Sequence, residues 1–169
     1  MNVLIIVLRL LHIVAGVFWV GAAMVSTFFL SPAVAATGEA GRAFMDYLIT
    51  KARISTRISA ASGTTVLAGA ILYWLDSQGF TSSWTTSGPG IGFALGAVLA
   101  LVGMGLGALV GASAKKLGAI AAAAKGKPSA AQLAELKAAQ ASMSRASLWS
   151  TVLLVISLVC MATARYWLF

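Results

Sequence analysis

The chain has 169 residues, of which 60% are hydrophobic and 9% are charged, and its formal net charge is +8. A soluble domain carries about 25% charged residues, so the composition excludes a soluble globular protein and indicates an integral membrane protein the length of one bundle. The positive charge does not point to nucleic acid, because the basic residues flank apolar segments as topology signals do. We therefore expect one membrane domain over residues 1–169.

Four apolar segments are long enough to cross a bilayer, which takes about 20 helical residues. They cover about residues 3–30, 54–75, 91–110 and 148–169. The helical pattern of the third segment continues to residue 124. The sequence thus predicts an all-α, four-helix integral membrane bundle.

The helix boundaries are marked by proline, glycine and capping residues. We expect Ser31 and Pro32 to end the first helix, and the break before Ser129 (Gly126-Lys127-Pro128) to separate the third from the fourth. Ser129 and Gln132 have the spacing of a capping box, which predicts a helix start. A helix from there to the end of the chain would be about 60 Å long, roughly twice the hydrocarbon thickness. Helices should therefore extend beyond the bilayer on one side.

The basic residues predict the topology. The loop at 76–90 carries no Lys or Arg, whereas the links on either side of it are basic. These cations are Arg42, Lys51, Arg53 and Arg57 in the first link and Lys115, Lys116, Lys125, Lys127, Lys137 and Arg145 in the second. By the positive-inside rule both links are cytoplasmic. Both termini and the 76–90 loop are then outside, where Tyr73, Trp74, Tyr166 and Trp167 would form an aromatic belt.

Glycines recur along the third segment at the spacing of small-xxx-small motifs. They are Gly92, Gly96, Gly103, Gly107 and Gly111. Such motifs let helices approach closely in lipid, so we expect these residues to serve helix packing. A flat cofactor against one or two of them is the alternative.

His12 is the only histidine, and it lies within the first apolar segment one helical turn after Arg9. Gly16 and Trp19 follow on the same face. An ionisable residue at membrane depth costs about 2.5–3.5 kcal/mol, which indicates a buried partner. Imidazole is a common ligand of metals and haem iron, so this stripe predicts a haem with His12 on the iron, Gly16 leaving room for the ring and Trp19 packing below it. The alternative is a hydrogen bond from His12 to a Ser or Thr of the second segment.

The last helix offers two further candidates at similar depth. Arg165 and Arg9 should both lie near the outer interface, where they could pair with the haem propionates. Met161 is one turn deeper than Arg165, level with His12, and is a candidate sixth ligand, since His/Met ligation occurs in haem proteins.

Two other functions remain open. Cys160, Met161 and His12 are soft or borderline ligands and would suit a copper-handling protein. A cofactor-free scaffold or accessory subunit of a membrane complex is the second alternative. The acidic residues Glu39, Asp46 and Glu135 lie in the links, so an enzyme here would be a haem-dependent oxidoreductase in which the cofactor does the chemistry.

The segment from Arg9 through Leu11, His12, Gly16 and Trp19 to Gly21 resembles the first helix of a group of small bacterial membrane proteins. The group includes the copper resistance protein D family, the membrane domain of cytochrome-linked urate oxidase and the four-helix protoporphyrinogen oxidase. The resemblance covers about 25 residues, through Ser31 and Pro32. It implies a multi-pass protein of the bacterial inner membrane in which the histidine at the place of His12 is an iron ligand.

Two departures from that group narrow the expectation. This chain has no further histidine for a second ligand, so His12 would act alone, with Met161, or with the His12 of a second copy in a homodimer. The third segment also lacks the basic residue that a protoporphyrinogen oxidase of this type uses, which argues against that activity. We expect one haem b in the outer half of the bundle, serving electron transfer or redox sensing with a redox partner at the outer face.

Overall fold

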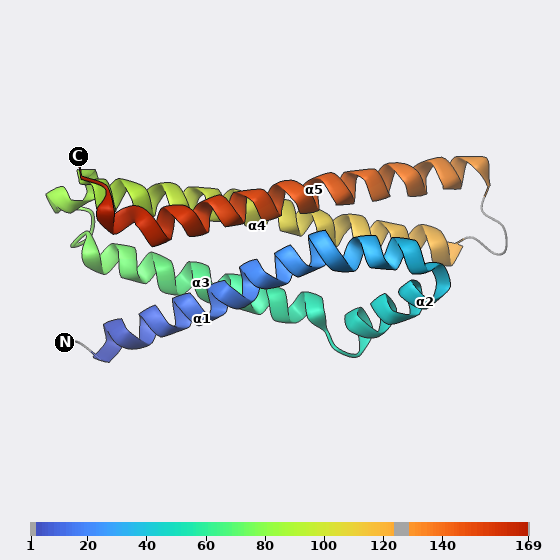
Figure 1. The fold of residues 1–169 in the computed structure, drawn as a ribbon, viewed down its shortest axis with the longest axis horizontal. Coiled ribbons are helices and arrows are strands. Elements are labelled where there is room, and N and C mark those ends of the chain that lie inside the picture. Colours follow the sequence, from blue (N-terminus) through green and yellow to red (C-terminus); the bar gives the residue numbers. More distant parts are fainter. Residues whose placement is uncertain (1–2, 124–128, 169) are drawn as a thin grey trace.

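The computed structural model describes residues 3–123 and 129–168, which form helices joined by short turns without any strand (Figure 1). The four long helical elements that could cross a membrane are α1 (Val3–Val25) with its continuation α2 (Ser31–Thr50), α3 (Ile54–Asp76), α4 (Gly88–Ala123) and α5 (Ala130–Thr163). Three short helical segments complete the fold: η1 (Ser26–Leu30), η2 (Ser83–Thr86) and η3 (Ala164–Tyr166). The predicted all-α four-helix architecture is confirmed.

The helix boundaries follow the sequence signals in most places. Ser129 accepts a hydrogen bond from the Gln132 backbone, and the Gln132 side chain accepts one from the Ser129 backbone, so the predicted capping box starts α5. The 36 residues of α4 and the 34 of α5 make helices of about 54 and 51 Å. Both therefore extend beyond a hydrocarbon core of about 30 Å. The predicted break at Gly126-Lys127-Pro128, the cation Lys125 and the two predicted end points, Ala124 and Phe169, lie outside the described residues.

The prediction that Ser31 and Pro32 end the first helix is wrong. A π-helical turn, η1, precedes them, and the Ser31 N–H and side chain both bond to the Ser26 carbonyl. Pro32 then sits in the first turn of α2, where its missing N–H costs little. The chain reverses instead at Gly38, whose φ of 59° suits a residue without a Cβ.

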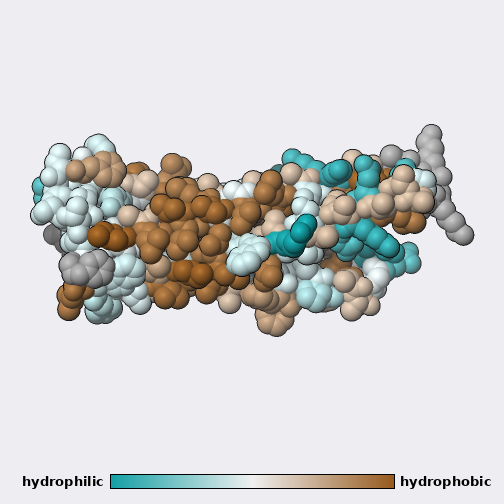
Figure 2. Space-filling model, turned by 90° about the horizontal axis from the view of Figure 1, so that it is seen from above, coloured by the Kyte–Doolittle hydropathy of each residue, from teal (hydrophilic) through white to brown (hydrophobic). Residues whose placement is uncertain are grey.

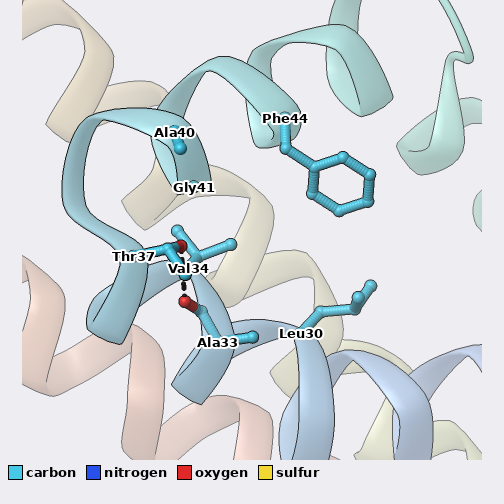
Figure 3. Close-up of a pocket in the computed structure, with 7 residues that line it drawn as sticks. All are labelled: Leu30, Ala33, Val34, Thr37, Ala40, Gly41 and Phe44. Atoms are coloured by element: carbon cyan, nitrogen blue, oxygen red, sulfur yellow. Dashed lines mark hydrogen bonds between the residues drawn. The ribbon is translucent and has the colours of Figure 1, made fainter.

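The reversal in α2 forms a tight elbow (Figure 3). Gly41 is buried there, and a Cβ on it would lie 2.6 Å from the Val34 carbonyl oxygen and would also meet the Thr37 hydroxyl. Thr37 in turn donates a hydrogen bond to the Ala33 carbonyl. The elbow therefore depends on two glycines, one for the turn and one for the close approach, and it sends the second half of α2 back toward α3 (Figure 1).

The bundle consists of two closely packed helix pairs, α1 with α3 and α4 with α5 (Figure 1). Trp19, Val20 and Leu154 form a buried cluster at their junction, where α1 meets α5. Polar contacts join the pairs on the side of the elbow. The Thr27 hydroxyl lies 2.8 Å from the hydroxyls of both Ser147 and Thr151 on α5.

Gly96 and Gly103 of α4 pack against α5, as the small-xxx-small pattern predicts, whereas a Cβ on Gly111 would have no neighbour within 4 Å. The Ser157 hydroxyl donates to the Gly96 carbonyl at 2.6 Å, and the Ser150 hydroxyl donates to the Gly103 carbonyl at 2.7 Å. A Cβ on Gly96 would lie 3.0 Å from Met161 Cγ, and one on Gly103 would lie 3.1 Å from Leu154 Cγ. Each contact thus combines close backbone approach with an interhelical hydrogen bond.

The polarity of the surface divides the molecule along its long axis. On the face shown in Figure 2, apolar residues form a belt beside the end that carries both termini, and hydrophilic residues gather at the opposite end. The elbow of α2 and the adjoining ends of α4 and α5, with their basic side chains, lie at that hydrophilic end. The belt is what a bilayer would cover.

The connection between α3 and α4 is a structured aromatic loop at the end with the termini. Tyr73 packs against Phe80 and Trp84, with ring centroids 5.9 and 5.2 Å apart, and Trp84 stacks on Phe93. The Ser77 hydroxyl, which is fully buried, accepts the Phe80 N–H. Tyr73 and Trp74 therefore belong to a larger aromatic group than the predicted belt.

The glycine–serine contacts predict which α4 glycines tolerate a large side chain. Gly96→Leu should force α4 away from α5 and lower the free energy of unfolding by about 1–3 kcal/mol. Gly105→Leu is the control, because a Cβ on Gly105 has no neighbour within 4 Å. Reversible unfolding in mixed detergent, followed by circular dichroism, measures both. Equal stability of the two variants would contradict the packing described here.

Candidate functional site

His12 lies at the interface between α1 and α3 and is half-buried. Its Nδ1 is 2.8 Å from the backbone carbonyl oxygen of Thr65. A carbonyl oxygen only accepts hydrogen bonds, so Nδ1 must carry the proton and donate it. In the neutral ring this leaves the lone pair on Nε2.

Two residues on α3 shape the contact with the ring. A Cβ on Gly69 would lie 2.7 Å from His12 Cε1 and 2.8 Å from Nδ1, so the ring occupies the space that the glycine leaves. Thr65, one turn earlier, is buried and gives its hydroxyl proton to the Ala61 carbonyl. The imidazole is therefore held by a hydrogen bond on one edge and by the α3 backbone against which it packs.

The Nε2 edge of His12 is not enclosed. The Nδ1 contact is the only hydrogen bond that the ring makes to residues 3–123 and 129–168. Within the same residues, Ser82 Oγ is the one fully enclosed side-chain polar atom without a partner. Nε2 therefore has no hydrogen-bond partner among these residues and is not fully enclosed by them, which leaves its lone pair free for a ligand.

Gly16 and Trp19 share the inward face of α1 with His12, as predicted, but both serve helix packing. A Cβ on Gly16 would be 3.4 Å from Thr65 Cγ2, so Thr65 fills the space beside the glycine. Trp19 is 5% exposed and packs with Val20 and Leu154 in the core. Thr65 is therefore the neighbour of Gly16 in this structure, and the role of Gly16 beside a flat ring stays a prediction.

The two predicted arginines are both exposed. Arg9 makes no ion pair or hydrogen bond within the described part of the chain, and it precedes His12 by one helical turn. Arg165 lies in η3, where its guanidinium carbon is 5.8 Å from the centroid of the Tyr166 ring. Arg9 is thus an open cation beside His12, whereas Arg165 belongs to the end of the α4–α5 pair.

Met161 is placed in a different helix pair from His12. Its Cγ and Cε would lie 3.0 and 3.1 Å from a Cβ on Gly96, so its thioether packs between α5 and α4. The hydrogen bonds of Thr151 on α5, to Thr27 in η1 and to the Ala23 carbonyl of α1, lie on the elbow side of Trp19. Equal depth in the membrane therefore does not bring Met161 to the imidazole.

The candidate copper ligands lie in different parts of the structure. Cys160 is buried on α5, beside Met161 in the sequence and outside the α1–α3 interface. Among the described residues, no three His, Cys, Asp or Glu side chains come together as a metal site would require. A metal site built from three residues of these four types is therefore not formed in that part of the chain.

Two surface depressions lie elsewhere. One, of about 450 Å³, is on the outer face of α1 and is lined by Leu10, Leu11, Val14, Ala15, Phe18 and Ala61. The other, of about 180 Å³, lies within the elbow of α2 (Figure 3) and is lined by Leu30, Ala33, Val34, Thr37, Ala40, Gly41 and Phe44. Neither depression includes His12.

The sequence predicted, as an alternative, a hydrogen bond from His12 to a Ser or Thr of the second segment, and the structure has one to the backbone carbonyl of Thr65. The sequence did not single out Thr65 itself or Gly69, which completes the surroundings of His12. Their spacing of four residues puts them on one face of α3, and a small residue one turn from a threonine is a signal for close helix contact. The Thr27–Ser147–Thr151 hydroxyl group was also missed. Hydroxyl residues inside apolar spans are the corresponding signal, because they bond across helices in lipid.

Comparison with family models, curated proteins and solved structures finds no match for the chain. The likeness of the first helix to the haem-binding membrane proteins therefore stays a resemblance.

The fit of His12 against Gly69 gives a direct test of the interface. Gly69→Ala should displace the ring, break the Nδ1–Thr65 hydrogen bond and lower the free energy of unfolding by about 1–3 kcal/mol. Gly63→Ala on the same helix is the control, since a Cβ there has no neighbour within 4 Å. Unfolding in mixed detergent compares the two. A Gly69 variant as stable as the Gly63 variant would contradict the contact.

Proposed function

We propose that this chain binds one haem b through Nε2 of His12 and serves electron transfer or redox sensing in a membrane. The observation that carries the proposal is the hydrogen bond from Nδ1 to the Thr65 carbonyl. A ligating histidine usually donates its other ring N–H to a carbonyl or carboxylate, which fixes both the tautomer and the orientation of the ring. His12 has this arrangement before any ligand is added.

A single accessible imidazole favours haem over a bare metal ion. A structural or catalytic ion needs three or four protein ligands, which the described residues do not gather. In haem the porphyrin supplies four of the iron ligands, so one histidine is sufficient, as in proteins with a single proximal histidine. The chemistry of the donor set therefore fits haem, with His12 as its ligand and Arg9 as the nearest free cation for a propionate.

The orientation of the protein in the membrane follows from the distribution of its Lys and Arg residues. With the basic end in the cytoplasm, the N-terminal half of α1 lies in the outer half of the membrane, so His12 is near the outer face. In a bacterium this is the inner membrane. Bound haem supplies one-electron exchange. The residues of the chain hold and orient it: Thr65 and Gly69 fix the ring of His12, and Arg9 offers positive charge.

A second candidate is an accessory subunit without a cofactor. The observation in its favour is that His12 already has a structural contact, because its ring fills the space at Gly69 and joins α1 to α3. On this account Nε2 would have no ligand, and removing the imidazole would affect stability alone.

An absorption experiment with a matched variant separates the two functions. The protein is purified from cells supplied with haem, and oxidised and dithionite-reduced spectra are recorded for wild type and His12→Gln. A glutamine amide can still donate to the Thr65 carbonyl, but it is a poor iron ligand. We expect a Soret band with sharp reduced α and β bands in wild type, and at least about a tenfold lower haem-to-protein ratio in the variant.

Ser157→Ala is the control, because it removes a comparable interhelical hydrogen bond from the α4–α5 pair and should leave the spectrum intact. A colourless wild type, or a His12→Gln protein that keeps its full haem content, would refute haem ligation by His12. A colourless wild type in which His12→Ala only lowers stability would favour the accessory subunit.

A further inference from the structure

A tight turn joins α2 to α3 and concentrates positive charge. The backbone N–H groups of Lys51 and Ala52 both bond to the Tyr47 carbonyl, and Arg53 adopts a left-handed conformation with φ of 49°. Arg57 follows one helical turn into α3, where its N–H bonds to the Arg53 carbonyl. Three cations thus lie within seven residues, at the start of a membrane span.

These three cations are not neutralised by the protein. Lys51, Arg53 and Arg57 are exposed, and no ion pair involves them within the described ranges 3–123 and 129–168. The nearest acidic residue along the chain is Asp46, on the preceding helix, and the next one is Asp76, at the far end of α3. We call Lys51, Arg53 and Arg57 the basic turn.

The second half of α2, which leads into the basic turn, exposes large apolar side chains. Phe44 is 49% exposed, Tyr47 60% and Ile49 46%. Phe44 also borders the depression in the elbow, opposite Leu30 (Figure 3). Met45 and Leu48 are half-buried. The exposed apolar side chains therefore flank the half-buried stripe of Met45 and Leu48 on both sides, next to a cationic turn.

We propose that the basic turn and the exposed apolar side chains of α2 bind anionic phospholipids of the leaflet on the cytoplasmic side. Two observations favour this occupant. The turn leads directly into α3, which is long and apolar enough to span a membrane and is mostly unburied, so the cations lie at the start of a candidate span. Clusters of Lys and Arg beside the cytoplasmic end of a membrane helix attract anionic headgroups, and an adjoining helix with aromatic and aliphatic side chains suits the headgroup–acyl boundary.

The proposal divides the roles between residues. Lys51, Arg53 and Arg57 bind phosphate oxygens, whereas Phe44, Tyr47 and Ile49 contact the glycerol and upper acyl region. We therefore expect the protein to prefer an anionic headgroup and to bind phosphatidylglycerol more tightly than phosphatidylcholine with the same acyl chains. It does not depend on whether His12 binds haem.

Native mass spectrometry of the full chain in detergent tests this preference. Each lipid is added at matched concentration, and the number of retained lipids is compared. We expect wild type to retain phosphatidylglycerol in preference to phosphatidylcholine. The triple variant Lys51→Gln/Arg53→Gln/Arg57→Gln should lower this preference by about tenfold.

The matched control removes the same charge from the other basic link, as Lys115→Gln/Lys116→Gln/Lys137→Gln. It should keep the preference of wild type within about twofold. If both triple variants lost the preference for phosphatidylglycerol equally, the lipid would be attracted by the overall positive charge at this end of the protein. That result would overturn a site at the basic turn. Equal retention of the two lipids by wild type would also overturn it, whatever the variants do.

Discussion

The helices of this protein come together where a small residue allows close approach and a side chain donates a hydrogen bond to a backbone carbonyl of its neighbour. In α4 and α5 the donors are Ser150 and Ser157, facing Gly103 and Gly96. In α1 and α3 the donor is His12, facing Thr65 beside Gly69. Lipid gives apolar helices little reason to associate with one another, so packing and such hydrogen bonds must hold the pairs.

This common arrangement explains how His12 can both join two helices and bind a ligand. A serine hydroxyl donates its single proton to the carbonyl, and it is not a usual ligand of haem iron. An imidazole that donates through Nδ1 keeps its second nitrogen, and that nitrogen is the better ligand because the ring can no longer rotate. The structural contact and the proposed haem ligation therefore use different atoms of one side chain. The helix contact would be present without haem, and the haem would bind to a ring already in position.

The four spans, the capping box at Ser129 and the packing role of the α4 glycines could be predicted, because each depends on local sequence alone. The position of the first break could not. Pro32 is a strong helix-stopping signal, yet the π-helical turn before it and its place in the first turn of α2 remove its effect, and Gly38 reverses the chain instead. The depth of Met161 in the membrane could be inferred by counting residues. The direction in which its side chain points from α5 could not, because that depends on tertiary packing against Gly96 of α4.

The central claim is the protonation of one ring, and the presence of a single histidine makes it measurable. Nitrogen-15 NMR of the histidine-labelled, cofactor-free protein in detergent gives one pair of imidazole signals, which report the protonation of Nδ1 and Nε2 separately. The account predicts that the neutral ring carries its proton on Nδ1 and none on Nε2. A proton on Nε2 with none on Nδ1 would contradict it, because the ring could then neither donate to Thr65 nor offer the nitrogen proposed to bind iron.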